Sequence, residues 1–175
     1  TFANGEDSNA EICGFTITHG NPGIYCSSSA PKITNCNITG NLLTAGIQCI
    51  MAFPTIKGCL ISNNKGLGIY SDYDSFTDVS HCIIAGNTQG GLYCGGSAIT
   101  NCSIIANRGF AVNTSPSTIT NCIFWENSIS YADIVTYCDI PDEYPALGNI
   151  VADPCFVMSG FWNDNGTPTY FADDF

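Results

Sequence analysis

Basic side chains are scarce in this sequence of 175 residues. Four Lys and Arg stand against fifteen Asp and Glu, so the formal net charge is −11. A charge of this sign repels nucleic-acid phosphates and anionic lipid headgroups. We therefore expect no nucleic-acid partner. The composition suits a soluble protein whose partners are neutral or are bound through divalent cations.

Long apolar runs are also missing. No segment approaches the roughly 20 apolar residues of a membrane span, and no charged region followed by an apolar run opens the chain. We expect no membrane insertion. The chain begins with Thr1 rather than Met, and we expect it to be a mature or excised piece of a larger protein.

Cysteine, by contrast, is abundant and regularly spaced. Six of the eleven cysteines recur at intervals of 23, 23, 20, 20 and 16 residues and form what we call the cysteine column: Cys36, Cys59, Cys82, Cys102, Cys122 and Cys138. Such a period is typical of stacked repeats. Two interpretations are open. A row of unpaired core thiols is favoured by the single repeated site, and a disulfide framework is the alternative.

The residues on either side of the cysteine column repeat as well. An Ile or Phe stands two residues after each cysteine, as in Cys36-Asn37-Ile38. The residue just before the column position is of a type that tolerates a left-handed backbone: Gly14, Asn35, Gly58, His81, Asn101 and Asn121. This pattern predicts a strand, a bend of one residue, and a second strand that starts at the cysteine.

An asparagine stands five residues after each of the first five cysteines. These residues form the asparagine column: Asn41, Asn64, Asn87, Asn107 and Asn127. Their constant offset favours a stack in which side-chain amides bond from coil to coil. The alternative is a set of independent turn residues.

A third strand follows a Gly-rich corner, as in Gly23-Ile24-Tyr25-Cys26 and Gly68-Ile69-Tyr70-Ser71. Period-two alternation turns the second and fourth residues of each run inward and the third outward. Three short strands per coil of about 20 residues predict an all-β, triangular parallel β-helix of about six to seven coils.

This pattern resembles the right-handed parallel β-helix repeat family, the pectate-lyase-like solenoids of large secreted bacterial proteins. The similarity rests on Gly23 to Cys26, Ile33 to Cys36 and Gly40-Asn41, and it covers roughly residues 9–140. It implies right-handed coils over residues 1–140 and an extracellular or cell-surface location. Residues 141–175 are expected to form an irregular segment, with capping of the last coil as its suggested role.

In enzymes of this family the substrate lies along one outer face of the helix. The resemblance matches that face to the tyrosine column of this chain, which we define as Tyr25, Gln48, Tyr70 and Tyr93. Aromatic side chains in register suit the apolar faces of sugar rings, so a neutral polysaccharide or cell-surface glycan is the expected partner. The alternative is that these tyrosines only stabilise neighbouring strands.

The family's lyases hold calcium with several carboxylates, and its hydrolases use grouped aspartates. We find no convincing catalytic set here. The best acidic group is Asp72, Asp74 and Asp78, in a loop that lengthens one coil. Oxygen ligands at alternating positions suit calcium. A solvated loop is the simpler interpretation, and no other cofactor is expected.

Four Asn-X-Ser/Thr sequons mark candidate glycosylation sites: Asn37, Asn101, Asn113 and Asn165. The first two flank cysteines of the column, where a small polar residue recurs within the repeat, so chance accounts for part of the count.

Three functions follow from these features. The leading hypothesis is a non-catalytic extracellular scaffold that binds carbohydrate through the tyrosine column. The second is a filament subunit, in which open ends of the helix stack head to tail as a homo-oligomer. The third is a polysaccharide lyase or glycoside hydrolase of the pectate-lyase-like fold.

Overall fold

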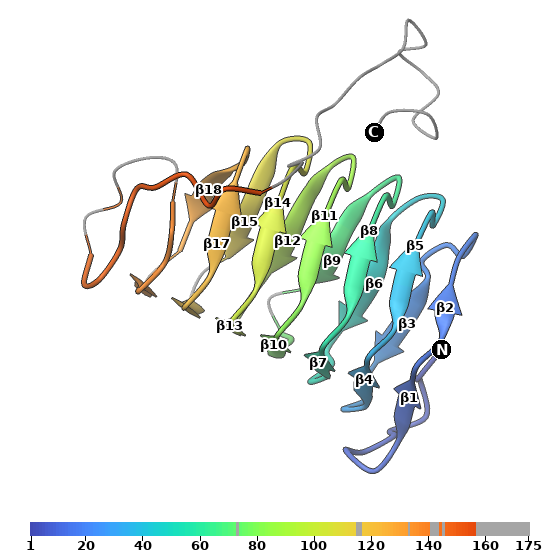
Figure 1. Cartoon of the computed structure of the whole chain (residues 1–175). Helices are drawn as coiled ribbons and strands as arrows, with labels where there is room; N and C mark the ends of the chain where they lie inside the picture. The colour runs from blue at the N-terminus through green and yellow to red at the C-terminus, as the bar shows by residue number, and fades with distance from the viewer. Residues whose placement is uncertain (73, 115–116, 133, 141–143, 145, 157–175) are drawn as a thin grey trace, which may run out of the picture.

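The computed structural model describes residues 1–72, 74–114, 117–132, 134–140, 144 and 146–156. These residues form nineteen short strands and no helix (Figure 1). The described part of the chain thus contains no helix long and apolar enough to cross a membrane. All strand pairings are parallel, and the strands wind in turn through three sheets around one core.

Each sheet takes every third strand, and we name it after its first strand. The β1 sheet contains β1 (Glu11–Cys13), β4 (Lys32–Thr34), β7 (Thr55–Lys57), β10 (Thr77–Ser80), β13 (Ser97–Thr100), β16 (Ser117–Thr120) and β19 (Ile134–Thr136). The β2 sheet contains β2 (Thr16–Ile17), β5 (Asn37–Thr39), β8 (Leu60–Ser62), β11 (Ile83–Ala85), β14 (Ser103–Ile105) and β17 (Ile123–Trp125). The β3 sheet contains β3 (Ile24–Ser27), β6 (Ala45–Ile50), β9 (Leu67–Ser71), β12 (Gly90–Cys94), β15 (Phe110–Thr114) and β18 (Ser128–Tyr131).

The predicted bends between the β1 and β2 sheets are confirmed. Every bend residue has a positive φ, from 51° at Asn35 to 76° at Gly14, and Tyr137 continues the series at 56°. The second strand, however, begins one residue after the cysteine rather than at it, as at Leu60 after Cys59. The backbone N–H of Cys59 lies 3.4 Å from the thiol of Cys82 in the next coil.

Isoleucine is the most frequent residue of the core. The inward residues of the three sheets stack coil on coil, and their side chains are almost completely buried, as for Ile33, Ile61 and Ile69. Each such side chain contributes about 1.5–3 kcal/mol through burial. The cysteine column lines the corner between the β1 and β2 sheets. Each of its thiols donates to the carbonyl oxygen two residues earlier, with sulfur–oxygen distances of 3.2–3.5 Å.

The asparagine column stands at the next corner and is joined by amide–amide hydrogen bonds. The Nδ2 of Asn41 donates to Oδ1 of Asn64 at 2.8 Å, and Asn64 and Asn87 each repeat this bond to the next coil at 2.9 Å. Asn107 donates to Asn127 at 3.3 Å. Each acceptor Oδ1 also receives the backbone N–H of the preceding asparagine, at 3.0–3.1 Å. The side chains therefore satisfy backbone groups that the turn leaves unpaired.

Glycine is required where the chain enters the β3 sheet. A Cβ on Gly68 would lie 2.7 Å from the carbonyl oxygen of Gly91 in the next coil and 2.8 Å from Cγ2 of Ile84. The last residue in this row is Ala111, which has a Cβ. There the next strand changes register, with Phe110 opposite Ser128 and Val112 opposite Ile129, so that no residue of β18 lies opposite Ala111.

Replacement of Gly68 by Ala is expected to destabilise the protein by about 2–3 kcal/mol, because the new methyl group meets backbone atoms that cannot rotate away. Urea unfolding followed by circular dichroism measures the change. Ala111→Gly serves as the matched control and is expected to cost about 1 kcal/mol or less. A loss for Gly68→Ala no larger than that of the control would contradict the steric explanation.

The segment after β19 bonds to the last coil. The N–H of Ile150 donates to the carbonyl of Cys138 at 2.9 Å, and the N–H of Ile140 donates back to Ile150 at 3.0 Å. Oδ1 of Asn149 accepts the N–H of Cys138 at 2.9 Å. The capping role predicted for residues 141–175 stays a prediction. Residues 141–143, 145 and 157–175 of that segment lie outside the described part.

Candidate functional site

The tyrosine column lies in register on the outer face of the β3 sheet. Tyr25 is opposite Gln48, Gln48 is opposite Tyr70, and Tyr70 is opposite Tyr93, with Asn113 next in line. All five side chains are half-buried, while the residues on either side of them in the strands point inward. The predicted alternation is therefore confirmed. The structure brings the four predicted residues together in one line.

Tyr70 and Tyr93 stack on each other. Their ring centroids are 5.7 Å apart and their planes differ by 12°. In this stacked pair each ring covers one face of the other, so a ligand cannot pack on those two faces. On its other side Tyr70 is in register with Gln48, and Tyr25 follows one coil further.

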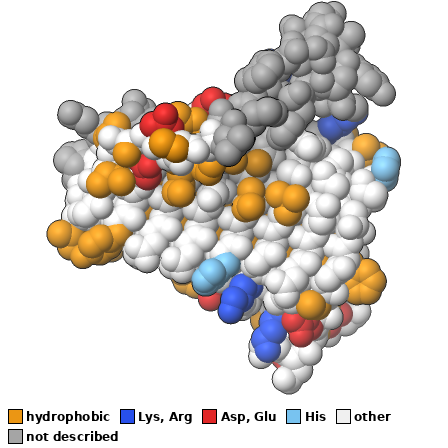
Figure 2. Space-filling view, in the orientation of Figure 1, with side chains coloured by type: hydrophobic (Ala, Val, Ile, Leu, Met, Phe, Trp, Pro, Cys, Tyr) orange, Lys and Arg blue, Asp and Glu red, His pale blue; other side chains and the backbone are white. Residues whose placement is uncertain are grey.

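Two of the three sheets have no ionisable acidic or basic side chain in their strands. None of the six strands of the β3 sheet contains an acidic or basic residue, and none of the six strands of the β2 sheet does. Figure 2 shows the β2 face as apolar and neutral side chains, with red and blue side chains toward its margins. Charged residues within strands occur only in the β1 sheet: Glu11, Lys32, Lys57 and Asp78.

The acidic loop does not bring its three aspartates together as metal ligands. Asp72 accepts the N–H of Met51 at 3.1 Å and the hydroxyl of Ser75 at 2.5 Å, which holds the loop against the preceding coil. Asp74 is exposed in the turn, and Asp78 lies in β10 on the β1 sheet. Among the described residues, no three His, Cys, Asp or Glu side chains are grouped so that they could hold a metal ion.

The sequon asparagines occupy different environments. Asn101 is exposed at a bend, whereas Asn37 is half-buried in β5 and its Oδ1 is buried without a hydrogen-bond partner. Asn113 extends the tyrosine column. Asn165 lies outside the described residues. Of the three described sequons, Asn101 is the most accessible, and glycosylation stays a prediction.

All eleven cysteines are free thiols, and the six of the cysteine column are buried, in line with the core-thiol interpretation of that column. Cys13 and Cys155 are exposed and the other nine are buried. The hydrogen bond between thiols of Cys82 and Cys102, together with burial, raises the pKa of Cys82 to about 12. Burial alone raises the pKa of Cys94 to about 12. These thiols remain protonated at neutral pH and are poor nucleophiles.

A hollow of about 420 Å³ opens at the corner between the β3 and β1 sheets, close to one end of the tyrosine column. Three successive coils contribute its lining: Gly5, Glu6, Asp7, Ser28, Ser29, Ala30, Met51 and Phe53. Met51 and Phe53 are 50% and 58% exposed, which is unusual for large apolar side chains.

Sequence reasoning missed this hollow because the residues that line it come from three different coils and are not part of the repeated pattern. The available signal was Phe53, an aromatic residue that sits before Pro54 at a corner where the preceding coil has Ala30.

Comparison with known families agrees with the geometry. The model of the right handed beta helix region matches residues 2–147. This chain belongs to that family. The three parallel sheets are therefore the sheets of a right-handed β-helix of about six coils, as expected from the repeat. No curated protein and no solved structure matches the chain. Family membership defines the β-helix fold and leaves its function open.

Proposed function

We propose that this β-helix is a non-catalytic extracellular scaffold that binds carbohydrate along the tyrosine column. The observation that carries the proposal is the in-register line of Tyr25, Gln48, Tyr70 and Tyr93 on a sheet without charged side chains. Neutral polyols favour such a surface, because aromatic groups contact their C–H faces and amide and phenol groups bond to their hydroxyls.

The helix also suits a spacer. Strands in adjacent coils lie about 4.8 Å apart, so six coils make a rod on the order of 30 Å long. Each coil is joined to the next by backbone bonds in three sheets and by the asparagine column. A ligand site built on this rod needs little ordering when it binds, which lowers the entropic cost of association.

The two alternatives have less support. Head-to-tail stacking would bring together a first coil that carries Glu6, Asp7 and Glu11 and a last coil that carries Asp139. No Lys or Arg precedes Lys32 or follows Arg108 in the sequence, so like charges would meet. A lyase or hydrolase would need acid and base groups on the substrate face, and the strands of the β3 sheet contain none.

Binding to a panel of neutral oligosaccharides, measured by calorimetry, tests the proposal. A variant with Tyr25, Tyr70 and Tyr93 all changed to Ala is expected to bind at least tenfold more weakly, with an unchanged circular dichroism spectrum. Tyr137→Asn is the matched control. It removes an exposed aromatic ring at the opposite corner and introduces the residue that Asn121 supplies at the same bend one coil earlier.

Two outcomes would overturn the proposal. One is that no neutral glycan binds the unaltered protein. The other is that Tyr137→Asn weakens binding as much as the triple variant does.

A further inference from the structure

The corner hollow arises from a missing side chain in a column of residues. Backbone hydrogen bonds place Asp7, Ala30, Phe53 and Phe76 at equivalent positions in four successive coils: Ala30 N–H bonds to the carbonyl of Glu6, Phe53 N–H to that of Ser29, and Phe76 N–H to that of Ala52. Ala30 is the smallest of the four. Its short side chain leaves a space between Asp7 on one side and Phe53 on the other.

The dimensions of this space suit a ring. Asp7 and Phe53 are two coils apart, which corresponds to about 9.6 Å between equivalent backbone positions. A ring placed over Ala30 would lie about 4.8 Å from Phe53, within the range at which rings stack. Met51 adds a second apolar wall.

The rim of the hollow is acidic. The carboxylates of Glu6 and Asp7 line it, and the sequence has no Lys or Arg before Lys32. Lys32 itself is in register with Glu11 in the β1 sheet. The Asn4 backbone N–H, 2.9 Å from Oε2, lowers the pKa of Glu6, so its carboxylate is charged at neutral pH. Asp7 accepts the N–H of Asn9 at 2.8 Å and keeps lone pairs for a further donor.

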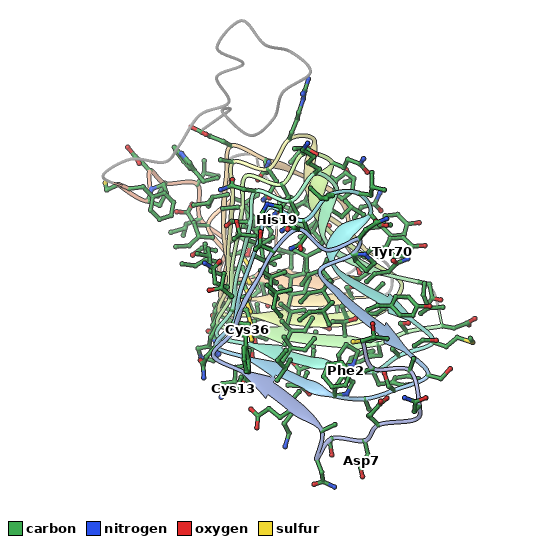
Figure 3. The ribbon with its side chains drawn as sticks, turned by 90° about the vertical axis from the view of Figure 1, so that its right-hand side faces the viewer. Phe2, Asp7, Cys13, His19, Cys36 and Tyr70 are labelled. Carbon is green, nitrogen blue, oxygen red and sulfur yellow. The ribbon has the colours of Figure 1, made fainter. Side chains whose placement is uncertain are left out.

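The hollow lies beside the tyrosine column. Ser28 follows Tyr25 by three residues, or about 10 Å along the strand direction. Figure 3 views the helix from its N-terminal end. Tyr70 and Asp7 lie on the right-hand side of the cross-section, away from the corner with Cys13 and Cys36. A chain molecule bound to the column can therefore continue into the hollow.

We propose that the hollow binds a sugar ring bearing a free ammonium group, so that the ligand of the tyrosine column is a polymer of amino sugars. This inference rests on the proposed carbohydrate function. The apolar face of the ring packs on Phe53, and the ammonium group donates to the carboxylate of Asp7, with Glu6 adding to the negative potential. A lysine side chain of a bound peptide would make the same ion pair with Asp7, but it has no sugar ring to contact the tyrosine column.

Two matched probes separate charge from shape at mildly acidic pH: the hexasaccharide of glucosamine, whose amino groups are then protonated, and that of N-acetylglucosamine, which has no free amino group. At 0.15 M salt we expect calorimetry to show at least tenfold tighter binding of the glucosamine hexamer. Ala30→Phe, which inserts the residue found at this position in the next two coils, and Asp7→Asn should each reduce this preference below twofold. Asp78→Asn removes the same charge from the β1 sheet and should leave the preference intact.

The possible failures are distinguishable. If Asp78→Asn reduces the preference as much as Asp7→Asn does, the effect is general electrostatic attraction and the inference is wrong. If both hexasaccharides bind equally well and both depend on the tyrosines, carbohydrate binding stands and the ammonium site does not. If neither hexasaccharide binds, the ammonium site is wrong, and the panel of other neutral glycans decides the carbohydrate proposal separately. Hexalysine that binds the triple tyrosine variant as tightly as the unaltered protein, and displaces the glucosamine hexamer, would assign the hollow to a basic peptide instead.

Discussion

Raising the pH from 9 to 12 is expected to unfold this β-helix. Buried thiols drive the transition. Hydrogen bonding to a neighbouring thiol and burial raise the pKa of Cys82 and of Cys102 to about 12, and burial raises that of Cys94 to about 12, from an ordinary value of 9.0. A raised pKa in the folded state means that folding favours the neutral thiol. The resulting stability is complete below pH 9 and is lost as the pH rises toward 12.

The expected loss of stability at alkaline pH is large. Each thiol loses about 1.4 kcal/mol per pH unit in this window, so three thiols lose about 4 kcal/mol per unit. Total stabilities of single domains are about 5–15 kcal/mol. A midpoint between roughly pH 10 and 12 is therefore expected, measured by circular dichroism during a reversible pH titration.

Cys94→Ser gives the matched test of this mechanism. Its position in β12 corresponds to Ser71 in β9, so the chain already accepts a serine there. The variant has one buried thiol fewer and should show a dependence of unfolding free energy on pH that is shallower by about 1.4 kcal/mol per unit. An unchanged slope would show that other groups cause the alkaline transition.

Asn87→Ala is expected to lower the free energy of unfolding by about 3–5 kcal/mol. The Asn87 amide accepts the backbone and side-chain N–H groups of Asn64 at 3.1 and 2.9 Å, and it donates to the carbonyl of Ile61 at 3.1 Å. The side chain is completely buried, so water cannot replace these partners. Alanine would leave a buried donor and acceptor unpaired and create a cavity.

Asn101→Gly is the control for this prediction. Asn101 is exposed at a bend with φ of 54°, and Gly58 occupies the same bend two coils earlier. Urea unfolding should show a change within about 0.5 kcal/mol for the control. If Asn87→Ala costs no more than that, the amide bonds of the column contribute nothing to stability.

Much of this architecture could be predicted from the sequence because parallel coils turn a period along the chain into a line in space. A residue such as Asn64, offset by five from Cys59, must stand beside its equivalents once the coils stack in register. The same logic identified the outward line of Tyr70 and Tyr93 and the left-handed bends. No information on long-range strand pairing was needed, because neighbouring strands in each sheet are one repeat apart in the sequence.

Other features depend on packing between coils, which the period does not encode. The stacking of Tyr70 on Tyr93, which decides the ring faces a ligand can use, needs the side-chain rotamers. The corner hollow depends on the size of Ala30 relative to Phe53, two residues at equivalent positions before a proline, and the period does not encode side-chain size. For the acidic loop, alternating aspartates suggested a cation site, but Asp72 uses its carboxylate to bond the loop to Met51 and Ser75.

Ala111 stands where the β3 sheet loses its regular register. At the earlier positions of this row, from Gly23 to Gly91, glycine leaves room for the backbone of the next coil to pack in register. The first methyl group in that row removes the space for the next backbone, and β18 continues only by leaving that position empty. The β1 sheet keeps its register at this point, since β19 still pairs residue by residue with β16. Lengthening this scaffold by inserting whole coils should therefore be done on the N-terminal side of Ala111.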